Sequence, residues 1–232
     1  MSFSPRSILI TGASSGMGAA TADLLAEQGA RVFTAQRGTC RHECITADFS
    51  DPAAPARVID AIRDRAGQLD ILVNNAGVMR EGTVEEMPLD DWHMQLQVNL
   101  TAPFLLIRHA MPLLRMQGGA IVNLSSAAAI LGAPALGVEY AASKGAIDVL
   151  TIGLGREVAA EGIRVNAVRP GIIDTEIHDS SGIPGRVKMM RDVIPMKREG
   201  TAEEVADAIV WLTSDQSTYV TGTIVTVAGG RC

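Results

Sequence analysis

Short apolar runs alternate with longer stretches of helical periodicity along most of the chain. Seven of these runs predict buried strands, at residues 7–10, 31–35, 43–47, 69–73, 120–124, 164–168 and 223–227. The helical stretches follow a glycine-rich turn at 11–18 or lie at 52–66, 91–116, 140–160 and 201–213. Apolar strands separated by helices are typical of a parallel sheet covered by helices. The pattern therefore predicts an α/β fold.

The second and third predicted strands are an exception, because no helix fits between them. Only Gly38 to His42 remain for the connection, and five residues span at most ~17 Å. A parallel crossover normally takes a dozen residues or more. We therefore expect this helix to be missing or reduced to a loop, which would leave the adenine side of any nucleotide pocket open.

Two local signals mark positions within the predicted helices. Pro103 removes a backbone donor and clashes with the carbonyl of Asn99 four residues earlier, which predicts a kink that frees Asn99 to bind water. The alternative is that Asn99 is an ordinary polar helix residue. Thr201-Ala202-Glu203-Glu204 forms a capping box, which predicts the start of the last helix.

Composition narrows the class of protein. Apolar residues make up 47% and aromatic residues only 3%, which indicates an aliphatic core. The net charge is −6 and no basic stripe occurs, which argues against a nucleic-acid partner. No apolar run reaches the length of a membrane span, and the N-terminus enters a strand at once, leaving no room for a signal peptide. We therefore expect a cytoplasmic protein.

The three cysteines, Cys40, Cys44 and Cys232, suggest free thiols, because their number is odd and we expect the cytoplasm. Cys40 and Cys44 flank His42 and could form a metal clip. No second pair of ligands occurs elsewhere, so we expect no metal site.

The turn Thr11-Gly12-Ala13-Ser14-Ser15-Gly16-Met17-Gly18 lies between a predicted strand and a predicted helix. Glycines let backbone N–H groups approach a pyrophosphate, and a helix N-terminus favours its negative charge. The spacing is G-x-x-x-G-x-G. The turn predicts a dinucleotide site, and the alternative is a plain tight turn.

The second strand ends in Gln36-Arg37 without an acidic residue. Dinucleotide folds often place a carboxylate here for the adenosine ribose, whereas an arginine suits a 2′-phosphate. The alternative is that Arg37 is only a solvated strand end. Asn74-Asn75-Ala76-Gly77 ends the fourth strand, where small and amide residues suit a close approach of backbone to ligand.

Tyr140 and Lys144 are four residues apart and share one face of a predicted helix. A free phenol has a pKa near ~10, and a nearby ammonium favours the phenolate. Lowering this pKa by ~3 units requires ~4 kcal/mol, so a cationic cofactor would help the lysine. The alternative is a core tyrosine and a solvated lysine at chance spacing. The apolar loop before Tyr140 could line a substrate pocket, and residues 172–200 are typical of a flexible lid.

Together these motifs resemble the classical short-chain dehydrogenase/reductase family over nearly the whole chain. The resemblance is carried by Thr11–Gly18, Asn74–Gly77, Asn99, Ser126, Tyr140-x-x-x-Lys144, Arg169-Pro170-Gly171 and the ending Gly229-Gly230. It implies a single domain over residues 1–232. That domain would be a doubly wound Rossmann fold, with a seven-stranded parallel sheet and helices on both faces. It also implies hydride transfer between a nicotinamide and a carbonyl or secondary alcohol.

The resemblance also implies the role of each site residue. Tyr140 would exchange the alcohol proton, Lys144 would bind the nicotinamide ribose and lower the Tyr140 pKa, Ser126 would hold the substrate oxygen, and Asn99 would hold a water. Ser125 is a weaker rival for Ser126, because the loop from Ser126 to Tyr140 is one residue longer than the family's common spacing. The implied cofactor residues, besides Tyr140 and Lys144, are Gly12, Ser14, Ser15, Gly16, Met17, Gly18, Gln36, Arg37, Asp48, Phe49, Asn75, Ala76, Gly77, Pro170, Gly171, Ile173 and Thr175.

Our first hypothesis is an NADP(H)-preferring carbonyl reductase or alcohol dehydrogenase, with NAD(H) as the alternative cofactor. The preference is expected to be modest, because Ser15 stands where many NADP-preferring relatives carry a second basic residue. The rivals are an NAD-dependent dehydrogenase of a cyclic diol or sugar, and a nucleotide-sensing protein without turnover. The set of Asn99, Ser126, Tyr140 and Lys144 argues against the sensor. The resemblance further implies a homotetramer or homodimer, paired through the helices that begin near Asp91 and Tyr140.

Overall fold

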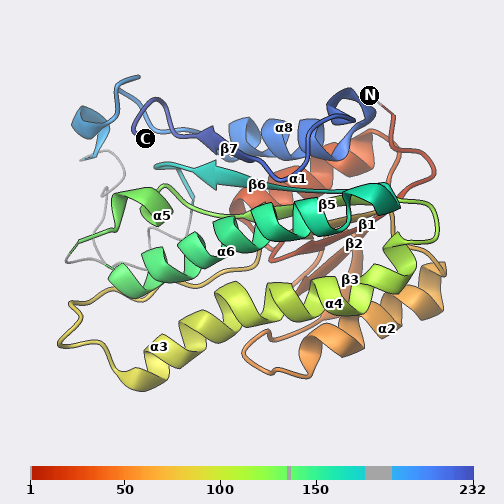
Figure 1. The fold of residues 1–232 in the computed structure, drawn as a ribbon, viewed down its shortest axis with the longest axis horizontal. Helices are drawn as coiled ribbons and strands as arrows, with labels where there is room; N and C mark the ends of the chain where they lie inside the picture. The colour runs from red at the N-terminus through yellow and green to blue at the C-terminus, as the bar shows by residue number, and fades with distance from the viewer. Residues whose placement is uncertain (1, 135–136, 176–189) are drawn as a thin grey trace.

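A computed structural model describes residues 2–134, 137–175 and 190–232. Across these residues the strands form one parallel sheet of seven in the order β3-β2-β1-β4-β5-β6-β7 (Figure 1). The strands are β1 Ser7–Thr11, β2 Arg31–Gln36, β3 Glu43–Thr46, β4 Ile71–Asn74, β5 Gly119–Leu124, β6 Ile163–Pro170 and β7 Ile224–Val227. The chain builds outward from β1 to β3 and then from β4 to β7. The direction therefore reverses between β1 and β4, where doubly wound folds bind ligands.

Helices cover both faces of the sheet (Figure 1). α1 (Gly16–Glu27) and α8 (Ala202–Thr213) pack together on one face, and α2 (Ala54–Ala66), α4 (Ala102–Leu114) and α6 (Val138–Glu157) cover the other. Successive strand residues alternate between the two cores: Ile8 packs on the first side and Leu9 on the second. Both faces of the strands are buried, which explains their unbroken apolar runs and confirms the predicted doubly wound α/β fold.

The expected kink in the helix over 91–116 is present. The structure divides this stretch into α3 (Leu89–Leu96), a π-helical turn η1 (Gln97–Thr101) and α4. Pro103 follows the π-helical turn and cannot donate the i→i−4 hydrogen bond to Asn99. The missing donor accounts for the local change in winding.

Several short elements complete the fold. The capping box is confirmed: the Thr201 hydroxyl accepts from the Glu204 N–H, and the Glu204 carboxylate accepts from the Thr201 N–H. A short helix α5 (Ala128–Leu131) was not predicted. The 3₁₀ turns are η2 Ala159–Glu161, η4 Arg191–Val193 and η5 Asp215–Ser217. Residues 176–189 of the predicted lid lie outside the described residues. Within those residues, no helix has the length and apolar character needed to cross a membrane.

The connection from β2 to β3 contains no helix, as predicted. Its shortness is possible because β3 starts late: Glu43 pairs with Phe33 rather than with the first residue of β2. From the end of β2 at Gln36, the chain therefore has to run back along the sheet by the length of only three strand residues, about 10 Å. The side chain of Gln36 also holds the loop, since its Nε2 donates to the Thr39 carbonyl at 2.7 Å.

The expectation of free thiols is wrong for two of the three cysteines. A disulfide joins Cys40 in this loop to Cys44 in β3, and Cys232 remains a free, exposed thiol. The return of the loop brings the two Cα atoms within 5.5 Å, a distance that a disulfide spans without backbone movement. Among the described residues no group of three His, Cys, Asp or Glu side chains could hold a metal ion.

Candidate active site

The predicted site residues gather at the carboxyl ends of the parallel strands. Here a cavity of about 540 Å³ is lined by Ser126, which follows β5, by Tyr140 of α6, and by Pro170 and Gly171 at the end of β6. Met17 of the glycine-rich turn lines the same cavity. Four segments that are far apart in the sequence therefore meet at one edge of the sheet.

The glycine-rich turn lies tightly against the segment that follows β4. Gly12 has φ +68°, and a Cβ atom at this position would lie 2.8 Å from the Cα of Ala76. The Asn75 Nδ2 donates to the carbonyls of Thr11 and Gly12 at 2.9 and 2.8 Å. The side chain of Asn75 therefore shapes the turn, a contact that the sequence did not predict.

A buried glutamine supports the same turn from β2. The Ala13 N–H donates to the Gln36 Oε1 at 3.2 Å, while the Gln36 Nε2 holds the loop at Thr39. Gln36 therefore couples the turn to the β2–β3 loop. Gly16, with φ +55°, begins α1, and Gly18 packs against the carbonyl of Gly12 without room for a Cβ atom. A bare backbone at a helix N-terminus is the cradle that a pyrophosphate requires, so these residues fit a dinucleotide.

At the adenosine end, Arg37 and Asp48 are both exposed. The Ser50 N–H and hydroxyl donate to Asp48, and these hydrogen bonds, with a smaller contribution from the charge of Arg37, lower the pKa of the Asp48 carboxyl. The side chain of Phe49 is buried in the core, so any contact of this residue with adenine would come from its backbone.

The other basic residues of the β2–β3 loop are already paired. Arg41 forms an ion pair with Asp23 of α1, and the His42 Nε2 lies 2.9 Å from the same carboxylate. Arg37 makes no hydrogen bond or ion pair with any residue in the described parts of the chain. It is the loop's cation best placed for an anionic ligand.

At the catalytic end, Lys144 is buried and its Nζ donates to the Leu124 carbonyl at 2.7 Å. The same Nζ lies 5.8 Å from the centre of the Tyr140 ring. A Cβ atom on Gly77 would lie 3.6 Å from this Nζ and 3.4 Å from the Asn99 Oδ1. The predicted residues Gly77, Asn99, Tyr140 and Lys144 are therefore brought together.

Asn99 has a structural task that the sequence did not reveal. Its Oδ1 accepts from the Val78 N–H at 2.8 Å and its Nδ2 donates to the Val78 carbonyl at 2.9 Å. The same Nδ2 also lies 3.2 Å from the Ser143 hydroxyl. Asn99 thus fixes the segment after β4 against α6, the helix of Tyr140 and Lys144.

The two titrating groups have shifted pKa values. Burial raises the pKa of the Tyr140 phenol, partly offset by a hydrogen bond with Ser126. Burial lowers the pKa of Lys144 to about 8, partly offset by the charge of Asp148. The shift at Tyr140 is opposite to the one predicted for the pair, because the cost of desolvation is larger than any effect of Lys144. The protein's own groups leave the phenol a weak acid, so additional positive charge is needed to activate it.

The structure favours Ser126 over Ser125 as the partner of Tyr140. The Ser126 hydroxyl interacts with the Tyr140 phenol and accepts from the Ala128 N–H at 3.1 Å. Ser125 is buried, and its hydroxyl lies 3.4 Å from the Lys144 carbonyl. Tyr140 therefore has Ser126 as its neighbour.

The segment after β6 faces the glycine-rich turn. Thr175 lies 3.2 Å from the position of a Cβ atom on Gly16, and Ile173 is buried and bridges to Gly200. β6 continues to Pro170, two residues past the predicted end of this strand at residue 168. Pro170, Ile173 and Thr175 all line the cavity.

Sequence reasoning missed a buried polar chain behind the site. The Asn74 Nδ2 donates to the Asn123 Oδ1 at 2.9 Å, and the Asn123 Nδ2 donates to the Thr151 hydroxyl at 3.0 Å. The chain links β4, β5 and α6. Its signal in the sequence was the pair of asparagines within otherwise apolar strands, at Asn74 and Asn123.

Fold and site together define a dinucleotide-binding α/β protein with a tyrosine–lysine pair beside the nucleotide cradle. A family model described as enoyl-(acyl carrier protein) reductase matches residues 12–231. An uncharacterized oxidoreductase of Escherichia coli, YgfF, is 46% identical and aligns over 96% of this chain and 98% of its own. The 3-oxoacyl-[acyl-carrier-protein] reductase FabG of Salmonella typhimurium is 34% identical, over 99% of this chain and 98% of its own.

Among solved structures, a candidate NAD(P)-dependent gluconate 5-dehydrogenase from Beutenbergia cavernae, with NADP bound, superposes with a TM-score of 0.92. It is 32% identical and the match covers 99% of this chain and 98% of that one. The chain belongs to the short-chain dehydrogenase/reductase family, and it is an oxidoreductase of that family.

Proposed function

We propose that the protein is an NADP(H)-preferring carbonyl reductase or alcohol dehydrogenase with Tyr140 as its general acid and base. The observation that carries this proposal is one cavity that contains Ser126 and Tyr140 and lies beside the glycine-rich turn. A nicotinamide, when bound, supplies or accepts the hydride. The chain must then bind the cofactor, orient the substrate and move one proton.

The residues divide this work. The Ser126 hydroxyl would hold the substrate oxygen close to the Tyr140 phenol. In reduction, Tyr140 would give its proton to the oxygen that gains negative charge, and in oxidation it would take that proton back. Lys144 would turn from the Leu124 carbonyl to the ribose hydroxyls of the cofactor. Asn99 would hold a water that connects Lys144 to solvent. Its side chain also fixes the backbone of Val78 next to this position.

Cofactor choice rests on Arg37. Its guanidinium is exposed at the end of β2, and Arg41 and His42 are held by Asp23. A 2′-phosphate adds about two negative charges, which suit a guanidinium. Asp48, whose low pKa keeps it ionised, would oppose this charge. We therefore expect a modest preference for NADP(H).

The substrate is proposed as a small ketone or secondary alcohol. One relative is described as a 3-oxoacyl-[acyl-carrier-protein] reductase, and one superposed structure as a candidate gluconate 5-dehydrogenase. The second of these favours, as a runner-up, a dehydrogenase of a sugar acid, sugar or cyclic diol. The presence of all four residues that would handle the proton argues against a protein that binds the nucleotide as a sensor without turnover. These residues are Asn99, Ser126, Tyr140 and Lys144.

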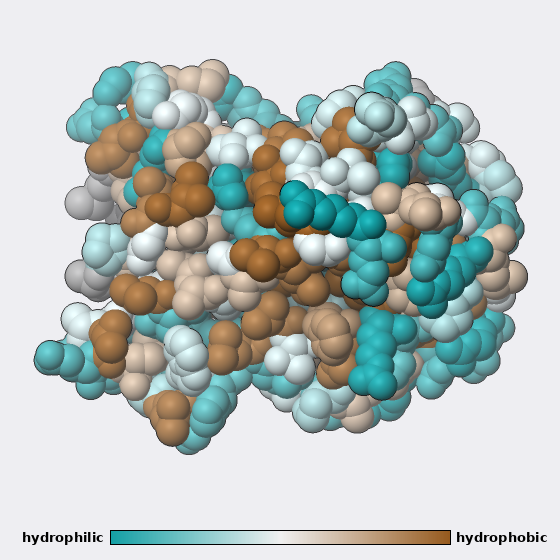
Figure 2. All heavy atoms as spheres, in the orientation of Figure 1, coloured by the Kyte–Doolittle hydropathy of each residue, from teal (hydrophilic) through white to brown (hydrophobic). Residues whose placement is uncertain are grey.

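We also propose a cytoplasmic homotetramer or homodimer. Apolar side chains gather across the middle of the face formed by α4 and α6 (Figure 2). Phe104 and Val149 are exposed there, by 47% and 71%. Leu150 and Leu154 of α6, by contrast, pack against the core. A monomer in light scattering at micromolar concentration would refute the assembly.

The direct test of function follows the absorbance of NADPH and NADH with a panel of acyl, cyclic and sugar-derived ketones. Turnover of at least one ketone, faster with NADPH, is expected. Complete inactivity toward ketones and toward the matching alcohols with the oxidised cofactors would refute the proposal.

A further inference from the structure

The segment that follows β7 reaches the candidate site. Arg231 follows β7, is half-buried, and lines the same cavity as Ser126 and Tyr140. Its N–H donates to the Ala228 carbonyl at 3.1 Å, which makes the tail a turn. The next residue, Cys232, lines a second cavity of about 390 Å³. The tail is therefore part of the wall between the two cavities, together with Ile172 and Ile173, which line both.

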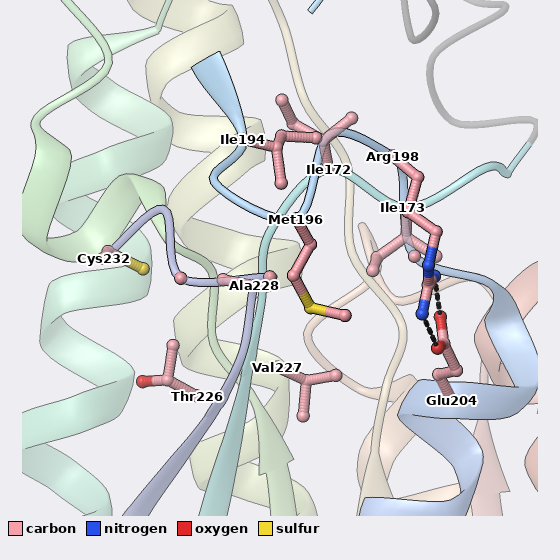
Figure 3. A pocket seen from close by; sticks show the side chains of 13 residues that line it. Ile172, Ile173, Ile194, Met196, Arg198, Glu204, Thr226, Val227, Ala228 and Cys232 are labelled. Carbon is pink, nitrogen blue, oxygen red and sulfur yellow. Dashed lines mark hydrogen bonds and ion pairs between the residues drawn. The ribbon is translucent and has the colours of Figure 1, made fainter. Parts of the chain in front are cut away.

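The charge of Arg231 lacks a partner in the described parts of the chain, where no carboxylate forms an ion pair with it and no acceptor takes a hydrogen bond from its guanidinium. Two arginines of β6 and η4 are neutralised: Arg169 by Asp148 at 2.6 Å and Arg191 by Glu199. Arg198 lines the second cavity and is held by both oxygens of Glu204 (Figure 3). A guanidinium is always charged, and partial burial without a counter-ion is unfavourable. An anion in the cavity would relieve this cost.

The rest of the cavity is mainly apolar. Among the described residues that line it, Glu81 is the only charged one besides Arg231, and it makes an interaction of its own. The apolar walls come from residues on four segments: Met79, Leu131, Pro134, Ile172, Met190 and Val193. Apolar walls with one cation suit a ligand with a hydrocarbon frame and one negative group.

We propose that Arg231 is a specificity residue that binds a carboxylate on the substrate. The substrate would be a ketone or secondary alcohol with an apolar frame that carries a carboxylate at one end. The oxygen to be reduced would lie at Ser126 and Tyr140, and the carboxylate would accept two parallel hydrogen bonds from the guanidinium. This inference rests on the proposed reductase activity and adds the class of substrate.

A cofactor phosphate is the competing anion. The pyrophosphate cradle follows β1, whereas Arg231 follows β7, four strands away in the sheet. Four strand spacings correspond to about 19 Å between the strand axes. Met17 of the glycine-rich turn nevertheless lines the same cavity as Arg231, so the KM for NADPH has to distinguish the two anions.

The experiment compares 4-oxocyclohexanecarboxylate with its neutral analogue 4-oxocyclohexanecarboxamide, using wild type, Arg231→Gln and Arg231→Lys. The wild type is expected to show at least a tenfold higher kcat/KM for the carboxylate. Arg231→Gln should remove the advantage of the carboxylate while leaving kcat/KM for the carboxamide within about twofold of wild type. Arg231→Lys should retain part of this advantage, because lysine keeps the positive charge but lacks the planar guanidinium. Arg63→Gln, which removes an exposed arginine of α2, is the matched control.

A second arm measures binding without turnover, by calorimetry of cyclohexanecarboxylate and cyclohexanecarboxamide on wild type and variants saturated with NADP⁺. Tighter binding of the carboxylate that depends on Arg231 is the expected result. Equal treatment of the two ligands would overturn the inference even if the carboxamide ketone is reduced, and the proposed function would then stand. If Arg231→Gln raised the KM for NADPH equally with both ketones, the arginine would bind the cofactor rather than the substrate. That result would also overturn the inference. Absence of reduction alone would refute the proposed function, and the binding arm would still decide the role of Arg231.

Discussion

The two ends of the proposed cofactor site are built in different ways. At the catalytic end, Lys144 and Asn99 are buried and bound to backbone groups of other elements, and a buried amide chain lies behind them. At the adenosine end, Arg37 lies in an exposed loop that replaces a helix and is closed by the Cys40–Cys44 disulfide. The chemistry therefore depends on groups fixed by the core, while the choice of cofactor depends on a surface loop. Changes at the two ends should have separable effects.

The largest effect is expected for Tyr140→Phe. This change keeps the ring and its packing but removes the exchangeable proton, so kcat should fall by ~100- to 10,000-fold while cofactor affinity changes little. The chain has only one other tyrosine, the fully exposed Tyr219. Tyr219→Phe is therefore the matched control and should retain wild-type kcat. A near-normal kcat in Tyr140→Phe would refute the proposed role.

Lys144→Met should damage both binding and rate, because Lys144 is proposed to hold the ribose hydroxyls and to support the phenolate. We expect a higher KM for the cofactor and at least a tenfold lower kcat. Lys197→Met serves as the control, since Lys197 is exposed and its Nζ donates to the Asp192 carbonyl. An unchanged alkaline limb of the pH–rate profile in Lys144→Met would show that the lysine does not act on the phenol.

Lys144 should also leave a signature in the pH dependence of stability. Its pKa is about 8 in the folded protein and 10.5 in the ordinary case. Between these values the unfolded chain holds a proton that the folded chain has released, so the free energy of unfolding should rise with pH in this window. The gain from this group between pH 7 and pH 9.5 should be about 2 kcal/mol. Urea unfolding of wild type and Lys144→Met over this range measures the difference, and parallel curves would contradict the burial of a charged lysine.

The smallest effect is expected at the adenosine end. Arg37→Ala should lower kcat/KM with NADPH about tenfold and leave the value with NADH nearly unchanged. The measurement should be repeated with a thiol reductant, which opens the Cys40–Cys44 disulfide and frees the loop. If the wild type preferred NADH and Arg37→Ala changed neither value, Arg37 would be only a solvated strand end.

The same contrast separates what the sequence could and could not predict. Apolar runs, the glycine-rich turn and the capping box act locally, so the strands, the start of α1 and the start of α8 could be predicted. Pro103 acts on Asn99 four residues away, so the change in winding could also be predicted. The clamp of Asn99 on Val78 joins residues 21 apart, and the contact of Asn74 with Asn123 joins residues 49 apart. Such contacts depend on strand order and register. The position of Arg231 beside Tyr140 could not be predicted for the same reason.

The central claim is that Tyr140 becomes a usable acid and base only when additional positive charge lies near it. The Tyr219→Phe variant leaves Tyr140 as the single tyrosine, so the ultraviolet absorbance of tyrosinate reports this residue alone. Its pH titration should be measured with and without saturating NADP⁺, the cationic form of the cofactor. The account predicts a Tyr140 pKa raised by burial above that of a free phenol in the free protein and a clearly lower pKa with NADP⁺ bound. The same pKa in both titrations would contradict it.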